Sequence, residues 1–530
     1  MTQAERKYPI GIQTFSEVIN RRCVYVDKTD LMWRLQDRYK YIFLSRPRRF
    51  GKSLLSSTFH SFFDGDKALF QGLKVMQLEE EWKQYPVLHL DLSVAKNQPS
   101  AEKLRETLMW LMQPLAEKYD VGKDANSPGK LLSALTHKAF ERTQTQVAII
   151  IDEYDAPLLD VLHSDQQLQD MRQVMQEFYS PLKMLDPMLR FCFITGITKF
   201  SQLSIFSTIN NLYNVSMLPE YAAICGITEE ELTTTLAPDI ALMAEANGIT
   251  PEEMHQRLKR HYDGYHFSKN CPDTYNPFSL IKAFDSKQMG AYWFDSGTPT
   301  FLIRQMQHFR TDITDIEKIE AAADEFDRPT EAMTTVLPLL YQSGYLTIKD
   351  YDAETDTYTL SIPNQEVRIG YMQGLLPTYI GLEGGSVRTG FAMKFWRALK
   401  KDDVDLAMRE LQAYMAGLPY VEGFKKKLEE AATREGFYEY TLYLIFSMLN
   451  VYVRTQVKCH KGRTDMVVLM PTTTYVFEFK ADGTAQQALE QIDTRDYALP
   501  YQTEGRRVVK VGVKFNANDR VPESWSVARQ

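Results

Sequence analysis

The feature that most constrains the fold is the stretch Ser45-Arg46-Pro47-Arg48-Arg49-Phe50-Gly51-Lys52-Ser53. It follows a short apolar run at 41–44, and the segment that begins at Leu54 has the composition of a helix. A strand, a tight loop ending in Gly-Lys-Ser and a helix form a phosphate-binding P-loop, or Walker A motif. In such a loop Lys52 supplies a cation to the phosphates, and Ser53 offers a hydroxyl to Mg²⁺. The usual first glycine falls at Arg46, so the loop alone leaves nucleotide binding and an ordinary turn equally open.

A second motif lies at 147–155, where a run of β-branched residues ends in Asp152 and Glu153. Such a run predicts a buried parallel strand, and ligands bind at the carboxyl ends of strands in open α/β sheets. This is the pattern of a Walker B strand, in which Asp152 holds Mg²⁺ and Glu153 polarises the attacking water. A buried strand that ends in a solvated acidic turn would look the same, but Gly51-Lys52-Ser53 upstream favours the nucleotide site.

The surrounding segments predict the rest of an α/β ATPase sheet. Strands are expected at 86–92 and 189–196, and helices near 101–119, 129–143 and 165–185. Thr195 or Thr198, after the last strand, is then placed to sense the γ-phosphate or the water, although a threonine at a strand end is often only a turn residue. The order of these elements predicts a parallel sheet with an additional strand between the two Walker motifs.

Composition excludes several other classes of protein. The net charge of −8 gives no overall basic signature, so nucleic-acid binding would need a local patch. No apolar run approaches the ~18 residues that span a bilayer, and the N-terminus lacks the apolar core of a signal peptide. The five cysteines are widely spaced without a C-x-x-C pair, which argues against zinc and disulfides and fits a reducing cytoplasm.

Several motifs resemble the AAA-ATPase-like family that is common in gut and anaerobic bacteria. They are Tyr8-Pro9-Ile10-Gly11, Tyr25-Val26-Asp27-Lys28-Thr29, Arg46–Ser53, Ile151-Asp152-Glu153-Tyr154-Asp155, Thr195-Gly196 with Lys199-Phe200-Ser201, and Asn210-Asn211-Leu212. Members of that family carry Arg-Pro-Arg-Arg-Phe-Gly-Lys-Ser where other ATPases have a glycine-led loop, so the resemblance implies that the missing glycine is a family habit. We expect Arg46 to add positive charge beside the phosphates and to strengthen nucleotide binding.

The motifs and the resemblance together predict an ATP site with Mg²⁺. The residues expected to bind the nucleotide are Arg46, Arg48, Arg49, Phe50, Gly51, Lys52, Ser53, Leu54, Asp152 and Thr195. Residues 1–226 are expected to form a P-loop AAA-like ATPase core and 227–325 a helical lid, in which Thr228 and Glu231 form a capping box. Residues 326–425 predict a winged-helix-like or helical linker whose hairpin turn is acidic, which favours a scaffold over contact with DNA.

Residues 426–530 hold a second chemical site. A helix at 435–450, strands at 451–459, 463–470 and 475–480, a helix at 484–499 and a strand at 508–515 predict an αβββαβ fold. Glu478 and Lys480 project from one strand face, and Asp465 starts the neighbouring strand. Asp…Glu-x-Lys is the metal site of the PD-(D/E)XK nuclease superfamily: carboxylates hold Mg²⁺, the metal lowers the pKa of a bound water, and the lysine orients that water.

Short Glu-x-Lys pairs are also commonplace on exposed strands. Here, however, Gly462–Asp465, Phe477–Lys480 and Ala488–Ile492 resemble the nuclease-like C-terminal domain that usually accompanies the ATPase-like family, over roughly residues 430–520. Glu439 could add a metal ligand from the first helix. Gln491, with Tyr497, is placed to orient the substrate or the Lys480 side chain.

The leading hypothesis is a cytoplasmic ATPase whose nucleotide module regulates a Mg²⁺-dependent nuclease-like domain acting on DNA or RNA, in defence or mobile-element biology. Its catalytic residues would be Glu153, Asp465, Glu478 and Lys480, and its metal ligands Ser53, Asp152, Asp465, Glu478 and Glu439. The alternative is a nucleotide-switched signalling or scaffolding ATPase whose C-terminal domain binds without cutting. An adaptor without catalysis would need neither Glu153 nor the Glu-x-Lys pair. A homo-oligomer stays open, since the loop arginines could serve a neighbour's nucleotide.

Overall fold

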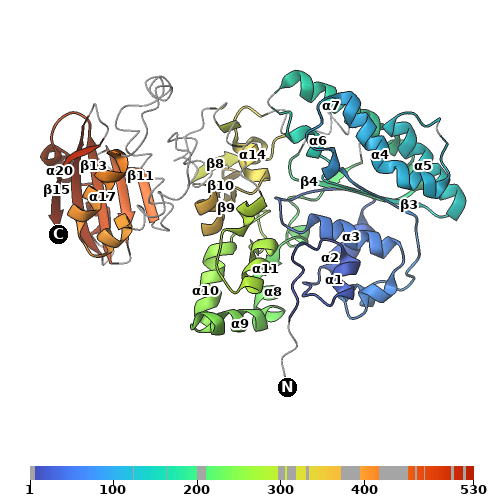
Figure 1. Cartoon of the computed structure of the whole chain (residues 1–530), viewed down its shortest axis with the longest axis horizontal. Helices are drawn as coiled ribbons and strands as arrows, with labels where there is room; N and C mark the ends of the chain where they lie inside the picture. The colour runs from blue at the N-terminus through green and yellow to red at the C-terminus, as the bar shows by residue number, and fades with distance from the viewer. Residues whose placement is uncertain are drawn as a thin grey trace. The chain divides into compact units, whose positions relative to one another are not determined.

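The structure is a computed structural model of the 530-residue chain. It describes residues 6–122, 124–162, 164–199, 211–296, 302, 305, 306, 309, 318–329, 333–371, 394–416, 452–459, 462–470, 472–502, 506–516 and 521–529. The chain divides into two compact units, Met1–Glu366 and Val367–Gln530, which are described separately (Figure 1). No helix in the described parts of the chain is long and apolar enough to cross a bilayer.

The first unit is built on a parallel five-stranded sheet in the order β2-β3-β4-β1-β5. Its strands are β1 (Tyr41–Ser45), β2 (Val87–Asp91), β3 (Val147–Asp152), β4 (Leu189–Gly196) and β5 (Tyr213–Asn214). β4 pairs with β1 on one side and with β3 on the other. The strand expected between the two Walker motifs in the sequence, β2, is present but lies at the sheet edge, and β4 is the strand that separates β1 from β3 in the sheet. The ends of β1 and β3 point to one edge, one strand apart.

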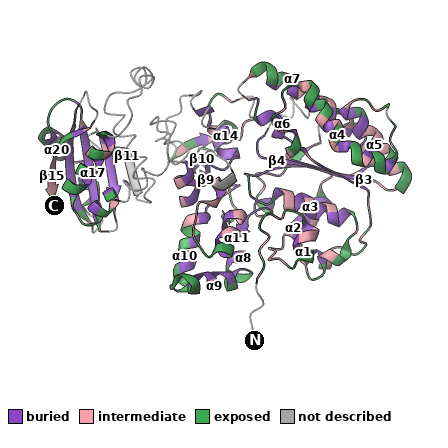
Figure 2. Ribbon diagram, viewed as in Figure 1, coloured by how far each residue is buried: buried purple, intermediate pink, exposed green. Residues whose placement is uncertain are grey.

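Helices cover both faces of this sheet, as apolar parallel strands require. Figure 1 shows α4 (Ala101–Tyr119), α5 (Pro128–Thr143) and α7 (Asp165–Tyr179) over one face, and α1 (Phe15–Asn20), α2 (Thr29–Arg38) and α3 (Lys52–Phe63) over the other. Every residue of β1 and β3 is buried, and the outer sides of α4 and α5 are exposed (Figure 2). The expected strands and helices of this region are therefore confirmed.

The segment that the sequence predicts to be a lid follows as a helical subdomain with its own apolar core. It contains β6 (Ile227–Thr228), α8 (Glu229–Thr234), α9 (Ala237–Asn247), α10 (Pro251–Tyr262), β7 (Thr274–Tyr275) and α11 (Pro277–Ser286). The predicted capping box is present: Thr228 Oγ1 accepts from the Glu231 N–H, and Glu231 Oε2 accepts from the Thr228 N–H. This exchange fixes the direction in which α8 leaves the core.

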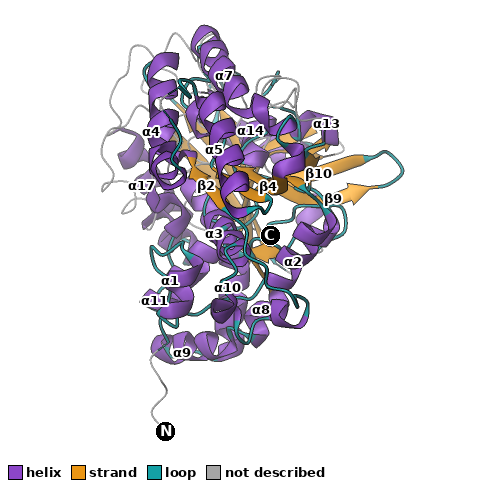
Figure 3. Cartoon of the chain, turned by 90° about the vertical axis from the view of Figure 1, so that its right-hand side faces the viewer, coloured by secondary structure: helices purple, strands orange, loops and turns teal. Residues whose placement is uncertain are grey.

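A small helix-and-sheet module completes the first unit (Figure 3). It comprises β8 (Ile319–Ala322), α13 (Ala323–Phe326), α14 (Leu337–Gln342), β9 (Thr347–Asp352) and β10 (Thr357–Ser361), with strand order β8-β10-β9. A helix followed by a hairpin is what the sequence predicts. β8 was not predicted, because Ile-Glu-Ala-Ala is too short to show an alternating pattern, and it lies before the expected boundary at 326.

The second unit is a mixed five-stranded sheet in the order β11-β12-β13-β14-β15. Its elements are α17 (Val404–Ala416), β11 (Tyr452–Cys459), β12 (Gly462–Leu469), β13 (Thr473–Lys480), α20 (Ala485–Thr494), β14 (Arg507–Phe515) and β15 (Pro522–Arg529). The βββαβ part of the prediction is present, with α20 connecting the parallel pair β13 and β14. The expected helix at 435–450 lies outside the described residues. The edge strand β15 was missed because its residues are mostly half-exposed and polar.

Candidate functional site

The loop after β1 has the backbone conformation that its sequence predicts for a phosphate loop. Arg49 and Gly51 both have left-handed backbones, with φ of 68° and 88°, and α3 begins directly after Gly51. Glycine adopts such a conformation without strain. The N–H groups of the first helical turn therefore face the open end of the loop, where helix termini bind anions.

Lys52 is almost fully buried and is held by the loop itself. Its Nζ donates to the carbonyl oxygens of Arg46 and Pro47, both at 3.0 Å. Burial lowers the pKa of Lys52, while the negative charges of Asp152, Glu153 and Asp155 oppose the shift. The ammonium thus lies inside the loop, close to the carboxylates at the end of β3.

Ser53 and Asp152 meet as a Mg²⁺ site requires. Ser53 lines a cavity wall together with Asp152, whose carboxylate is buried at the end of β3 and accepts from the Glu153 N–H at 3.0 Å. Burial raises the pKa of Asp152 to about 6, although the Ser53 hydroxyl and the charge of Lys52 oppose that rise. Carboxylate and hydroxyl oxygens are ligands that hard cations such as Mg²⁺ prefer. The residues present therefore fit the metal that the motifs imply.

Glu153 is held by a residue that the sequence did not single out. Its Oε2 lies 2.6 Å from Nζ of Lys96, on the turn that follows β2, and Glu153 has a left-handed backbone with φ of 48°. Burial alone would raise the pKa of Glu153, but the Lys96 ammonium, with Lys52 and Arg48, brings it below its usual value. Glu153, which the sequence predicts to polarise the attacking water, is therefore ionised and paired with Lys96.

Lys52, Ser53, Lys96 and Glu153 line a cavity of about 570 Å³, whereas Asp152 lines a second cavity of about 310 Å³ that shares Ser53 in its wall. Around the phosphate loop the wall of the larger cavity is charged or polar, with Arg48, Arg49, Lys52, Ser53, Lys96 and Glu153. Elsewhere the wall is mostly apolar, with Lys28 as a charged exception, and it combines the N-terminal segment with residues between 224 and 281, through Pro9, Ile10, Ile12, Val26, Ile224, Ile227, Phe278 and Ile281. A charged end and an apolar end in one cavity suit a nucleotide, which carries phosphates at one end and a base at the other.

Arg46 is placed differently from the expectation. Its guanidinium is buried on the far side of the loop and donates to four carbonyls, those of Ser45, Ser216, Tyr221 and Ala222, at 2.7–3.4 Å. It also stacks on Phe267, 4.3 Å from the ring centroid, and it does not line the cavity. Arg46 consequently ties β1 to the segment after β5 instead of adding charge beside the phosphates.

Thr195 and Thr198, the two residues considered for sensing the γ-phosphate, both donate hydrogen bonds within the protein, and Phe50 packs against another ring. The Thr195 hydroxyl is fully buried and donates to the Leu44 carbonyl at 2.7 Å, so it does not reach the cavity. Thr198 donates through its hydroxyl to Asp155 at 2.6 Å. Phe50 packs edge-on against Tyr265, with 4.7 Å between ring centroids. Phe50 still lines the cavity together with Leu54, but its ring anchors the loop to the segment after α10.

Asp155 is a structural partner whose role the sequence did not reveal. Its buried carboxylate accepts from the N–H groups of Ile197 and Thr198 and from the Thr198 hydroxyl. It therefore joins the turn after β3 to the turn after β4. Lys199 continues this connection, because its N–H donates to Gln342 of α14 at 2.8 Å and its ammonium pairs with Asp327.

The second unit brings together three of its predicted site residues. Asp465 Oδ2 accepts from the Phe479 N–H at 2.7 Å, and Glu478 Oε2 accepts from the Asp465 N–H at 3.4 Å. The Gln491 amide on α20 donates to Glu478 Oε1, and Tyr497 hydrogen-bonds to Gln491. The two carboxylates thus lie side by side on β12 and β13, with α20 fixing one of them.

Two carboxylates fit a divalent cation that completes its shell with waters and substrate oxygens. The described residues contain no group of three or more His, Cys, Asp or Glu side chains arranged for a metal. Lys480 lies two residues after Glu478 on the same strand, as predicted. Glu439 lies outside the described residues.

Comparison with known proteins gives matches to both units. Residues 9–206 match the family model described as predicted AAA-ATPase, and residues 433–525 match the PD-(D/E)XK nuclease superfamily. A protein of Azotobacter chroococcum mcd 1, described as an uncharacterized protein in the vnfD 5′ region, is 31% identical over 532 residues and covers 98% of both chains. No solved structure matches the chain. The chain therefore belongs to the family of predicted AAA-ATPases that carry a C-terminal domain of the PD-(D/E)XK nuclease superfamily.

Proposed function

We propose that the chain is a Mg²⁺-dependent ATPase whose nucleotide module controls a metal-dependent nuclease acting on DNA or RNA. The observation that carries the ATPase half is the meeting of Lys52, Ser53 and the Asp152–Glu153 pair at one edge of the sheet. The nuclease half is supported by the adjacent Asp465 and Glu478 carboxylates in a domain of the matching superfamily.

In the ATPase unit each side chain has a distinct task. The loop N–H groups and Lys52 bind the phosphates, and Ser53 and Asp152 would hold Mg²⁺, which neutralises charge on the phosphate oxygens. Glu153 accepts hydrogen bonds from the attacking water and aligns it with the terminal phosphorus. This step requires Glu153 to turn from Lys96, so we expect turnover to be slow until that ion pair opens.

In the second unit Asp465 and Glu478 would hold the metal, and Lys480 would orient the water or offset the charge that develops on the phosphate. Bound metal supplies a water that ionises near neutral pH. Gln491 restricts Glu478 to one orientation, since its amide occupies one carboxylate oxygen. The other oxygen stays directed toward the Asp465 strand.

The test combines a phosphate-release assay with cleavage of single- and double-stranded DNA and RNA, each with Mg²⁺ or Mn²⁺ and with and without ATP. We expect Lys52→Ala to abolish ATP binding, and Glu153→Gln to bind ATP without turnover. Glu478→Gln and Lys480→Ala should abolish cleavage but retain ATPase activity. Wild-type protein that hydrolyses ATP but leaves every nucleic acid intact would refute the nuclease half alone.

A second candidate is a nucleotide-switched scaffold in which neither site turns over quickly. It is favoured by the pairing of both key carboxylates with protein side chains, Glu153 with Lys96 and Glu478 with Gln491. Under this reading, ADP would remain bound through purification, and added nucleic acid would not accelerate phosphate release. Rapid multiple turnover of ATP by the wild-type protein would reject it.

A further inference from the structure

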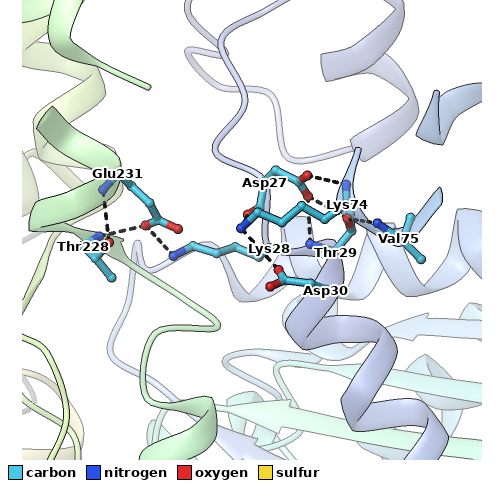
Figure 4. Close-up of polar contacts among 8 residues, drawn as sticks. All are labelled: Asp27, Lys28, Thr29, Asp30, Lys74, Val75, Thr228 and Glu231. Atoms are coloured by element: carbon cyan, nitrogen blue, oxygen red, sulfur yellow. Dashed lines mark hydrogen bonds and ion pairs between the residues drawn. The ribbon is translucent and has the colours of Figure 1, made fainter. Parts of the chain in front are cut away.

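Lys28 lines the same cavity as Lys52 but comes from a different part of the chain. It precedes α2, and its neighbours in the cavity wall include Val26, Cys225 and Ile227, away from the phosphate loop in sequence. Its side chain is 12% exposed, and Nζ lies 2.6 Å from Oε2 of Glu231 on α8. Figure 4 shows the Lys28 side chain extending from the start of α2 across to the lid.

The backbone that carries Lys28 is fixed by its neighbours. Asp27 Oδ1 accepts from the N–H and hydroxyl of Thr29, and Asp27 Oδ2 accepts from the Lys74 N–H at 2.7 Å. The Thr29 hydroxyl oxygen in turn accepts from the Val75 N–H at 3.1 Å (Figure 4). Because Asp27 and Thr29 are both used in this way, Lys28 is presented to the cavity from a rigid base.

Glu231 does not depend on Lys28 for its position. Its Oε2 also accepts from the Thr228 N–H at 2.9 Å, as the second half of the capping box that starts α8. The carboxylate would therefore remain in place if Lys28 moved. Lys28 is the flexible partner of a fixed acceptor.

The interaction with one carboxylate, Glu231, only partly offsets the cost of burying the Lys28 ammonium. An ammonium has three N–H donors, and across the described part of the chain Lys28 Nζ has a single hydrogen-bond acceptor, Glu231. Burial lowers the pKa of Lys28, and the charge of Glu231 offsets the effect only in part. A buried cation with spare donors in a cavity wall is stabilised by a further anionic or oxygen acceptor in that cavity.

We propose that Lys28 is a nucleotide-binding residue, which donates to a ribose or phosphate oxygen of the nucleotide while it remains paired with Glu231. This inference rests on the proposed nucleotide site and adds a second lysine to it, outside the phosphate loop. The same ammonium then contacts both ligand and α8, so nucleotide binding and the position of the lid are linked through one side chain.

The test is isothermal titration of ATP, with Mg²⁺ present, into the full-length wild type and four variants. Lys28→Met should raise the Kd for ATP about tenfold, the range expected for loss of one charged hydrogen bond. Lys28→Arg should recover most of the affinity. Glu231→Gln keeps the capping contact and frees the ammonium, so its Kd should be equal to or lower than that of the wild type. Lys103→Met, which removes an exposed lysine outside the cavity wall, should change Kd less than twofold.

A raised Kd for ATP in Lys28→Met together with an unchanged or lowered Kd in Glu231→Gln would show that Lys28 contacts the ligand. An ion pair with only a structural role would give the same change in both variants. Equal loss of affinity in both variants, or no loss in Lys28→Met while the wild type binds ATP, would overturn the inference and leave the nucleotide site intact. Wild-type protein that binds no nucleotide would overturn the nucleotide site itself. Thermal melts without ligand identify any variant that is unfolded.

Titration of ADP and AMP locates the contact along the nucleotide. A similar penalty of Lys28→Met for ATP, ADP and AMP would place it at the ribose or α-phosphate. A penalty confined to ATP would place it at the γ-phosphate. Either result supports the inference, and Lys28→Met values equal to wild type for all three nucleotides contradict it.

Discussion

The ammonium of Lys96 lies 2.6 Å from Oε2 of Glu153, so a side chain that follows β2 holds the carboxylate at the end of β3. Both residues are about one-third exposed, which lets the pair exchange with solvent. The carboxylate expected to align water is therefore paired with Lys96 instead.

We expect Lys96→Met to raise the basal ATPase rate severalfold with little change in KM, because Glu153 becomes free to accept a hydrogen bond from water. Steady-state phosphate release measures this effect. Lys103→Met is the matched control, since it removes a lysine from an exposed ion pair with Glu106 on α4. A fall to the rate of Glu153→Gln would show instead that Lys96 is needed at the phosphates.

The buried Asp152 carboxylate predicts a pH dependence of metal binding. Its pKa of about 6 means that the carboxylate loses its charge as pH falls through 6, and Mg²⁺ competes poorly with a proton there. Mg²⁺-dependent ATP affinity should therefore decline steeply between pH 7 and 5, whereas ATP affinity measured in EDTA should change little. If ATP affinity declined equally with and without Mg²⁺, the group that titrates would be one other than Asp152.

The same group should oppose folding at higher pH. A carboxyl whose folded pKa exceeds its unfolded value destabilises the native state as pH rises from about 4 to above 6. Asp152→Asn should thus raise the free energy of unfolding of the nucleotide-free protein at pH 8 by roughly 1–3 kcal/mol, while it removes stabilisation by Mg²⁺ and ATP. Chemical denaturation with and without ligand measures both effects. A variant less stable than wild type at pH 8 would contradict the prediction.

Arg46 should matter for stability rather than for charge at the phosphates. Arg46→Met leaves buried carbonyls without a donor and should lower the free energy of unfolding by about 3–5 kcal/mol. Arg46→Lys should recover little, because an ammonium cannot span carbonyls that a planar guanidinium joins. Titration of ATP into the folded fraction tests this prediction, and we expect a Kd near that of the wild type. A large increase of the Kd in a well-folded variant would show that Arg46 contributes to nucleotide binding.

Gly344 brings the helix-and-sheet module against the phosphate loop. A Cβ at Gly344 would lie 2.6 Å from Cβ of Pro47, and its φ is +89°. Gly72 has a similar φ of +83° but open space, so Gly72→Ala isolates the backbone penalty of about 1–2 kcal/mol. We expect Gly344→Ala to destabilise the protein further and to weaken ATP binding. If both variants lost the same stability and bound ATP equally well, the close approach of Gly344 to Pro47 would not matter for either property.

Much of the first unit could be predicted because its signals are local. Strands β1, β3 and β4 are apolar runs of a length that fits only buried strands, and Gly51-Lys52-Ser53 marks the turn into α3. The capping pair Thr228 and Glu231 likewise sits three residues apart in the sequence. What was missed depends on partners distant in the chain. Arg46 donates to the Tyr221 carbonyl and Lys28 donates to Glu231. These partners are more than 170 residues apart in the chain, so no short motif predicts either hydrogen bond.

In the nuclease-like site, too, the residues held by local regular structure could be predicted and the others could not. Asp465, Glu478 and Gln491 are close because a hairpin and a crossover helix are regular structures whose registers follow from the sequence. The edge strand β15 gave no signal, since a half-exposed strand with serines and a glutamate resembles a loop. The sequence predicts that Gln491 orients the substrate or the Lys480 side chain, whereas its amide donates to Glu478.

The closure of the phosphate loop by distant segments has a consequence for biosynthesis. Pro47 is covered by Gly344, and the Arg48 carbonyl accepts from the indole of Trp293 at 3.2 Å. At about 5–20 residues per second, these partners leave the ribosome on the order of tens of seconds after the loop. During that time the phosphate loop of the nascent chain lacks these packing partners, so nucleotide and chaperones can reach it. A synonymous change that slows translation between residues 60 and 340 should therefore affect yield of this protein more than the same change after 370.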